Sequence, residues 1–535
     1  MNKLLVGRGT VVLNAERTPP YVRAGCHCSC LMISCSVYCP TACSTQFQPV
    51  HQLPKMPLTV LTDSEVRTLL LGLTKQDILD LQQSLADGLH YYSTSTEEDS
   101  NGCGSSYQPL RTSLKRSDGQ TTLFMPASSN DSLGVKIVTL AEPESDIAKR
   151  RTPKNGSISS GRGSLASFDS LSLSQSSPSI ESSNTTFDGP PDSVASKDST
   201  TPKGLLTLLD RSGAPRALIN AEEITAFRTA LASTMLFKKR ANVHDVVVFG
   251  AGKQAYWHIR LALILRGPEI HHLNIINRSF DRVHHLIQTL YHPHEQPHVF
   301  PKMDIPTAQT TDLARPKIQI ITPNHTEYER LLKATIRASS VIFCTTPSLT
   351  PLFPASYLTN PEGRKKGRYV AAIGSYKPHM LELHPDILRQ NVAPDHHRHH
   401  HKHALEGGAV IVDSVEACLK EAGEIIQAGL TGQEVVEIGE LVMLRRDAEK
   451  RRQECVARKS EEGLDERGVE LGECEQRKKK KGKKEKEDDG GLMEWLQRGN
   501  VIYKSVGLGL MDVVVGSELV AMADEKGIGT RIENF

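Results

Sequence analysis

The sequence predicts an α/β protein built around a doubly wound, largely parallel sheet. Short apolar runs, each long enough for a buried strand, recur along the chain, and segments with helical spacing separate several of them. Strands that alternate with helices are typical of parallel sheets covered on both faces. The runs expected to form strands are Val246–Phe249, Leu273–Ile276, Ile318–Ile321, Val341–Phe343, Tyr369–Ile373 and Ala409–Val412.

A glycine turn connects the first of these strands to a helix. Gly250 and Gly252 follow the strand directly, and Ala255 precedes an apolar helical stretch. The first glycine permits a tight turn, the second lets the backbone approach a pyrophosphate, and a small third residue allows close packing of helix and strand. Free N–H groups and the positive dipole end of the helix then face the phosphates. The sequence predicts a Rossmann-type dinucleotide-binding domain; the alternative is an ordinary tight βα turn.

The end of the second strand indicates which dinucleotide is bound. Asn277 and Arg278 stand about where an Asp or Glu would bind the ribose diol of NAD(H). No acid repels a 2′-phosphate there, and a guanidinium forms charge-assisted hydrogen bonds to phosphate. The sequence therefore favours NADP(H), with NAD(H) as the alternative. Arg278 as a solvated loop charge is the competing interpretation.

Two later strands end in loops that are candidates for the edge of a cofactor or substrate site. Cys344–Pro347 and Gly374–Pro378 both begin at carboxyl ends of expected strands. Ligands of open α/β sheets bind at those ends. Routine turns ended by proline explain the same residues equally well.

Helices with recognisable caps flank the nucleotide unit. Thr62 to Glu65 has capping-box spacing, and an apolar stripe at helical intervals follows. A second capping-box pattern, Asn220 to Glu223, precedes a helix with one apolar face. Arg228 is expected at the edge of that face, pointing into a cleft; the alternative is a solvent-facing side chain. The apolar stripes are Ile78, Leu81, Leu85 and Leu89 in the first helix, and Ile224, Phe227, Leu231 and Met235 in the second.

Several tracts are expected to lie outside the folded core. The Ser-rich stretch 145–203 has the composition of a disordered insertion, the His-rich run 394–403 that of a solvated loop, and the Lys/Glu-rich stretch 445–498 that of a charged, partly helical insertion. No aromatic or groove-reading motif accompanies the lysines, and the formal net charge is only +2, so we expect no specific nucleic-acid partner. A bare histidine run lacks the surrounding structure that a zinc site needs, so no metal is expected.

Cysteine usage indicates a reducing compartment. Six of the 11 cysteines crowd between Cys26 and Cys43, without a convincing signal peptide or pairing pattern. A zinc or disulfide knot is the alternative to a disordered Cys-rich extension over 1–55. No apolar stretch approaches the length of a membrane span. We therefore expect a cytoplasmic protein with no membrane partner.

Many separated motifs resemble the ornithine cyclodeaminase/μ-crystallin family. The resemblance covers residues 56 to about 144, 204 to about 444, and 499 to 535, so each long polar tract falls outside it or in an insertion. The motifs occur in the order of the family: Gln108–Arg111, Leu123–Pro126, Gly134–Thr139, Ile224–Thr229, the glycine turn, Ile373–Pro378 and Lys504–Gly507.

The resemblance implies a homodimer whose substrate and dimerisation domain is an α/β unit built from both chain ends. That domain would comprise 56–144, 204–240 with its connecting helix, and 499–535. The Rossmann domain would span 241–413, followed by return helices over 414–444.

The resemblance also implies roles for individual residues. Arg111 and Lys136 match positions that hold a substrate carboxylate, the first through two hydrogen bonds and the second as a point charge. Arg228 matches a residue that reaches cofactor and substrate. Family positions near the cofactor or substrate are matched by Thr345, Ser505 and Val506. Family contacts at the phosphate turn are matched by Lys253 and Gln254, which follow Gly250 and Gly252.

One departure from the family bears on the reaction. Tyr376 stands where the cyclodeaminases carry an acidic proton-transfer residue, and Met380 replaces a cofactor lysine. Ornithine cyclisation requires proton transfers, and a tyrosine with its usual pKa near 10 is a poor base at neutral pH. We therefore expect an NADPH-dependent reductase of a small imine or ketimine carboxylate, or the reverse oxidation of an amino acid. Tyr376 or a bound water is the candidate proton donor, and Lys136 is a second candidate catalytic residue. The alternatives are an ornithine cyclodeaminase that recycles NAD, and a non-enzymatic NADPH-dependent small-ligand binder.

Overall fold

The computed structural model describes residues 57–96, 102–117, 120–141, 203–293, 313–392, 408–441 and 493–535. The Cys-rich extension 1–55 and the His-rich run 394–403 lie outside the described residues. The Ser-rich stretch lies outside them except for Lys203, the first residue of a strand. The Lys/Glu-rich stretch lies outside them except for residues 493–498. Residues 493–498 are helical, and Trp495 and Leu496 are buried in the core, so the folded chain resumes earlier than expected.

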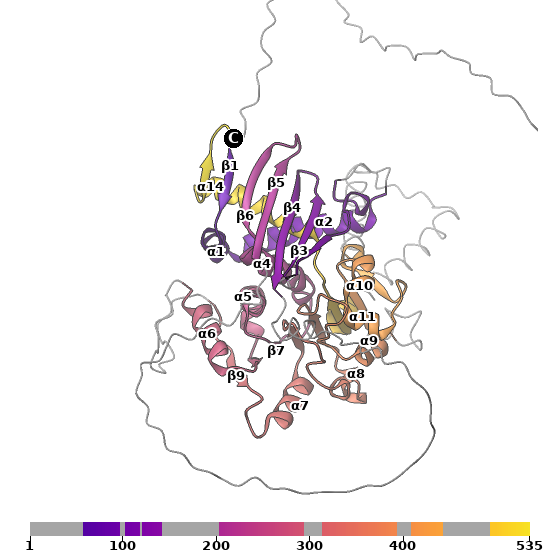
Figure 1. Ribbon diagram of the computed structural model, residues 1–535. Coiled ribbons are helices and arrows are strands. Elements are labelled where there is room, and N and C mark those ends of the chain that lie inside the picture. The colour runs from indigo at the N-terminus through magenta and orange to yellow at the C-terminus, as the bar shows by residue number, and fades with distance from the viewer. Residues whose placement is uncertain are drawn as a thin grey trace, which may run out of the picture. The chain divides into compact units, whose positions relative to one another are not determined.

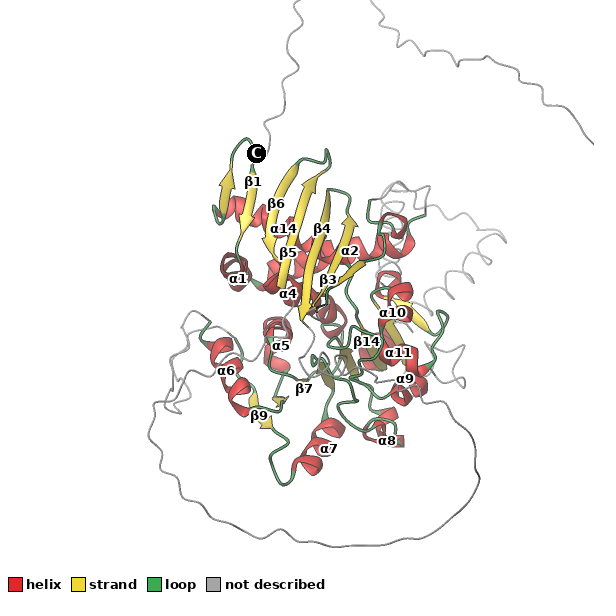
Figure 2. Cartoon of the chain, viewed as in Figure 1, coloured by secondary structure: helices red, strands yellow, loops and turns green. Residues whose placement is uncertain are grey.

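An eight-stranded parallel sheet forms the lower half of Figures 1 and 2, in the order β13-β12-β14-β11-β10-β7-β8-β9. Alternate residues of β7 enter two separate apolar clusters, Val246 and Val248 on one face and Val247 and Phe249 on the other. The expected doubly wound sheet is thereby confirmed. Its strands are β7 (Asp245–Phe249), β8 (His272–Ile276), β9 (Lys317–Ile321), β10 (Val341–Cys344), β11 (Tyr369–Ala372), β12 (Gly408–Val412), β13 (Val435–Glu437) and β14 (Asn500–Lys504).

Helices cover both faces of this sheet. Apolar side chains of α5 (Lys253–Arg266) and α6 (Phe280–Tyr291) join the first cluster. Those of four other helices join the second: α7 (Tyr328–Ala338), α9 (Pro385–Asn391), α10 (Val415–Glu421) and α11 (Gly423–Ala428). A short helix, α8 (Pro361–Lys365), precedes β11.

The carboxyl-terminal boundaries of the two domains differ from the sequence expectation. We expected 414–444 to return to the first domain and 499–535 to belong to it entirely. Instead α10, α11 and β13 pack with the Rossmann sheet, and β14 pairs with β11 on one side and β12 on the other. The return to the first domain comes after β13, over residues 438–441, where a Cβ at Gly439 would meet the carbonyl oxygen of Leu89. Val501, Ile502 and Tyr503 are buried on both faces of β14, and such a strand is stable only with a partner at each edge.

A second, seven-stranded sheet belongs to the first domain, in the order β15-β1-β6-β5-β4-β3-β2. Helices α2, α4 and α14 lie behind it in Figure 2, so one face is covered and the other faces the viewer. Strand β1 and helices α1 and α2 come from the start of the described chain, and α14 and β15 come from its end, as expected. The elements are β1 (Leu58–Leu61), α1 (Asp63–Leu71), α2 (Lys75–Thr94), β2 (Thr112–Lys115), β3 (Gln120–Ser128), β4 (Ser132–Ala141), β5 (Lys203–Asp210), β6 (Pro215–Asn220), α4 (Ala221–Phe237), α14 (Gly509–Lys526) and β15 (Thr530–Ile532).

Helix caps are partly as expected. Thr62 and Glu65 form the capping box at α1, and the stripe of α2 is buried. At α4, Asn220 accepts the N–H of Glu222 rather than that of Glu223, which donates to Asp63 at 3.0 Å. The Glu223 side chain is turned inward and accepts the indole N–H of Trp257 at 2.7 Å, so it cannot complete a capping box. None of the described helices is long and apolar enough to cross a membrane.

Candidate active site

The glycine turn after β7 has the geometry that a dinucleotide diphosphate requires. Gly250 has a φ of +110°, and a Cβ there would lie 2.9 Å from the hydroxyl oxygen of Thr345, so only glycine fits without strain. Gly252 caps α5 with no side-chain hydrogen bond, and a Cβ at this position would meet nothing within 4 Å. The N–H groups of the first turn of α5 therefore border open space, and the turn fits a bound phosphate.

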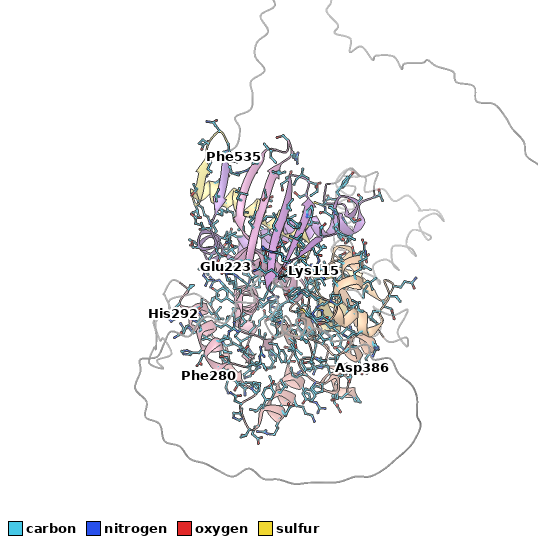
Figure 3. All side chains as sticks on the ribbon, in the orientation of Figure 1. Lys115, Glu223, Phe280, His292, Asp386 and Phe535 are labelled. Carbon is cyan, nitrogen blue, oxygen red and sulfur yellow. The ribbon has the colours of Figure 1, made fainter. Side chains whose placement is uncertain are left out.

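Lys253 and Gln254 begin α5 but take different roles. The Lys253 ammonium lies 2.9 Å from Asp63, 3.0 Å from Glu223 and 3.4 Å from Glu222, and so it faces the first domain. The group that Lys253 can offer a phosphate at this turn is therefore its backbone N–H. The buried Oε1 of Gln254 has no hydrogen-bond partner among the described residues. Figure 3 labels Glu223 where the two domains meet.

Asn277 and Arg278 lie beside this turn, since the N–H of Gly250 donates to the last residue of β8, Ile276, at 2.9 Å. The Asn277 side chain donates to the carbonyl of Ser279 at 2.8 Å, which fixes the loop. Arg278 is exposed. The loop thus presents an exposed cation at the carboxyl edge of β8, where the adenosine ribose binds in Rossmann domains.

Lys136, Arg228 and Asp512 form a buried cluster between β4, α4 and α14. Oδ1 of Asp512 lies 2.8 Å from Nζ of Lys136 and 3.1 Å from Nε of Arg228. All three side chains are at most 5% exposed, so the alternative of a solvent-facing Arg228 is wrong. Burial lowers the pKa of Lys136 to about 8, although Asp512 acts in the opposite direction. Two cations on one carboxylate leave the cluster with one positive charge to offer.

Arg111 lies within electrostatic range of this cluster and of Tyr376. Nε of Arg111 donates to Glu421 at 2.6 Å, and a second guanidinium nitrogen also contacts that carboxylate. Burial lowers the pKa of Arg111; the charge of Arg228 acts in the same direction and Tyr376 in the opposite one. Burial raises the pKa of Tyr376, and the positive charge of Arg111 opposes that effect, so the phenol is protonated at neutral pH. The structure therefore brings Arg111, Lys136, Arg228 and Tyr376 into one region.

Ser505 and Val506 follow β14, and Asp413 holds them in place. The Asp413 carboxylate accepts the hydroxyl of Ser505 at 2.7 Å and the N–H groups of Val506 at 3.1 Å and Gly507 at 2.7 Å. A Cβ at Gly507 would lie 2.8 Å from the guanidinium of Arg228, so this loop touches the buried cluster. The hydroxyl of Thr345 donates to the carbonyl of Phe249 at 2.7 Å and so lies against the glycine turn.

A second buried cluster of charged side chains, Glu382, Glu424 and Lys504, holds the loops after β10 and β11 in place. Glu382 accepts the N–H groups of Thr346 and Gly374, each at 2.7 Å, and thereby ties together the loops after β10 and β11. The N–H of Glu382 donates to Glu424 at 2.8 Å, and Glu424 lies 3.2 Å from the ammonium of Lys504. Burial raises the pKa of Glu382, while Lys504 and the backbone N–H groups act in the opposite direction.

The sequence reasoning missed the acidic partners of these groups. Asp413 had a usable signal, because it directly follows an expected strand and so lies at the ligand-binding edge of the sheet. Glu421, Glu424 and Asp512 sit in helices, and no local pattern distinguishes them from solvated acids. Among the described residues, no group of three His, Cys, Asp or Glu side chains is placed to hold a metal ion.

Sequence and structure comparisons find relatives over most of the chain. An uncharacterized protein of Saccharomyces cerevisiae is 24% identical over 405 residues, which span 72% of this chain and 87% of that protein. A Δ(1)-pyrroline-2-carboxylate reductase of Bacillus cereus is 23% identical over 436 residues, 79% and 89% of the two chains. No family model matches the chain.

The fold is shared with solved enzymes. The structure of Thermococcus litoralis Δ(1)-pyrroline-2-carboxylate reductase, in complex with NADH and L-proline, superposes with a TM-score of 0.52 at 16% identity. The match covers 89% of this chain and 100% of that one. This likeness shows a shared fold, in which a Rossmann domain is combined with an α/β domain built from both chain ends. The sequence relatives agree with the resemblance of the chain to the ornithine cyclodeaminase/μ-crystallin family.

Proposed function

We propose that the protein is an NAD(P)H-dependent oxidoreductase that reduces a small cyclic imine carboxylate, or oxidises the matching amino acid. The observation that carries this proposal is the buried cluster of Lys136, Arg228 and Asp512, which has one more cation than anion. Such a cluster, shielded from water, favours an anionic group such as a carboxylate. The names of the Bacillus and Thermococcus relatives agree with this substrate class.

The side chains of this chain would act chiefly by binding and orienting the substrate. Arg111 and Lys136 would hold its carboxylate, and Arg228 would border both substrate and cofactor. A nicotinamide cofactor bound at the glycine turn supplies the hydride. Tyr376 is protonated at neutral pH, so it is suited to donate a proton to the imine nitrogen rather than to act as a base.

Glu421 would compete with the substrate carboxylate for Arg111. Among the described residues, two guanidinium nitrogens of Arg111 contact the Glu421 carboxylate. A substrate that uses Arg111 must therefore displace Glu421 or share the guanidinium with it. Lys136 and Arg228 share the single carboxylate of Asp512, so they keep one positive charge for the substrate and no acid has to be displaced from them.

The cofactor preference is proposed to be NADP(H) over NAD(H). The supporting feature is the exposed Arg278 after β8, together with Asn277 in place of an acid. An Arg at this position pairs with a 2′-phosphate, whereas an Asp or Glu would select the ribose diol. We also retain a cytoplasmic location as a prediction of the sequence.

The first test is a titration with NADPH and NADH, followed by addition of a cyclic ketimine carboxylate. We expect NADPH to bind more tightly and to be oxidised, and Arg111→Ala to raise KM because the guanidinium no longer holds the carboxylate. Unchanged KM and turnover in Arg111→Ala would remove Arg111 from the clamp. Release of ammonia from ornithine without added reductant would identify a cyclodeaminase instead. NADPH binding without turnover of any imine or amino acid would identify a binding protein.

A homodimer is proposed from the uncovered face of the seven-stranded sheet. Alternate residues of neighbouring strands place Leu114, Leu133, Leu205 and Leu218 on this face, between 37% and 55% exposed. An apolar sheet face of this kind is typical of protein interfaces, and a second copy of the chain would bury it. We expect sedimentation to give twice the chain mass and Leu218→Glu to lower it toward one chain. A single-chain mass for the unaltered protein would contradict the dimer.

A further inference from the structure

Asp512 is a buried carboxylate whose two oxygens have unequal surroundings. It lies in the first turn of α14, with 0% exposure. Oδ1 contacts both Lys136 and Arg228, whereas Oδ2 has no hydrogen-bond partner among the described residues. A helix from the carboxyl-terminal end of the chain thus supplies one acceptor oxygen to two cations from distant elements, β4 and α4.

We propose that Asp512 is a positioning residue that keeps Lys136 in its ammonium form and aims Lys136 and Arg228 at the substrate carboxylate. The inference rests on the proposed function, because it concerns the carboxylate clamp of that reaction. Asp512 itself need not touch the substrate. It acts through the two cations that it holds.

The charges around Lys136 explain why this residue depends on Asp512. The groups that perturb its ammonium are Asp512, Arg228 and Arg111, of which only Asp512 is negative. Burial and two neighbouring cations all favour the neutral amine, and only the Asp512 carboxylate favours the charged form. Without this charge, Lys136 would lose its proton at a lower pH and could no longer attract a carboxylate.

The stoichiometry of the cluster also fits a clamp. Two cations share one carboxylate, so the cluster carries one positive charge, and a bound substrate carboxylate would bring it to neutrality. A second acid in this cluster would cancel its positive charge before the substrate bound. The single carboxylate of Asp512 therefore keeps Lys136 protonated and still leaves a positive charge that attracts an anion.

The activity test compares Asp512→Asn with Lys136→Arg over a range of pH. In the unaltered enzyme, kcat/KM should fall about tenfold per pH unit above pH 8, because Lys136 loses its proton. In Asp512→Asn this fall should begin at least one pH unit lower, and in Lys136→Arg it should disappear, since arginine stays charged. The titration of the substrate is common to all variants. An unshifted profile in Asp512→Asn, or a fall in Lys136→Arg at the same pH as in the unaltered enzyme, would overturn the inference.

A second readout needs no substrate. A lysine whose folded pKa lies below its unfolded value near 10.4 makes the unfolded chain bind more protons between the two values, so stability rises with pH across that window. Asp512→Asn should extend this rise to lower pH, and the stability lost on substitution should shrink as the pH increases. In a Lys136→Met background the loss should be independent of pH.

The two readouts separate the inference from the function on which it rests. If no ketimine is reduced but denaturation shows the pH dependence, the proposed reaction fails and the control of Lys136 by Asp512 stands. If ketimine is reduced but the loss of stability in Asp512→Asn is the same at every pH, Asp512 has a merely structural role and the inference fails.

Discussion

Lys504→Met is expected to lower the free energy of unfolding by about 3–5 kcal/mol, because it leaves a buried carboxylate without its cation. Lys504 and Glu424 are each 1% exposed and lie 3.2 Å apart. The Oε2 atom of Glu424 has no hydrogen-bond donor among the described residues, so the ammonium is its essential partner. Chemical denaturation with urea measures the change.

A second substitution tests whether the loss comes from the unpaired carboxylate of Glu424. Glu424→Gln in the Lys504→Met background should recover part of the loss, because a neutral amide keeps an acceptor oxygen for the N–H of Glu382. Lys420→Met is the matched control: this lysine pairs with Glu416, but both are more than half exposed, and we expect less than about 1 kcal/mol. If Lys504→Met lowered the free energy of unfolding by no more than Lys420→Met does, the ion pair of Lys504 and Glu424 would not be what stabilises this cluster.

Lys136→Met is expected to lower kcat/KM by roughly 30- to 1000-fold, which corresponds to about 2–4 kcal/mol. The variant removes one of the cations that would hold the substrate carboxylate. Asp512 keeps Arg228 at 3.1 Å, so the buried carboxylate is not left without a partner. Steady-state kinetics with a ketimine carboxylate measures the effect.

The affinity for NADPH distinguishes this loss from misfolding. Lys136 lies in the first domain, on β4, and the glycine turn lies in the Rossmann domain, so the Kd for NADPH should change less than threefold. Lys333→Met, an exposed lysine of α7, is the control and should leave kcat/KM unchanged. A Lys136→Met enzyme with unaltered kcat/KM would exclude Lys136 from the clamp.

The sequence predicted the nucleotide unit well because its signals are local. Apolar runs of strand length, a glycine that must adopt positive φ and a helix start are all encoded by neighbours in the chain. The capping box at Thr62 was confirmed for the same reason. The second capping box was wrong in detail because the side chain of Glu223 turns inward and pairs with Trp257 and Lys253 of another helix.

By itself, then, the sequence determined six strands of the Rossmann domain, the glycine turn after the first of them, and three of the cations in the candidate site, Arg111, Lys136 and Arg228. Only the tertiary structure decided which acids meet those cations. Asp512 is 376 positions from Lys136 and 284 from Arg228, and Glu421 is 310 positions from Arg111. The physical reason is that ion pairing depends on the distance between two charges in space and on their burial. Both are set when helices and strands pack, and the spacing of residues along the chain determines neither of them. The position of β14 in the Rossmann sheet was decided in the same way, by the need of a buried strand for partners at both edges.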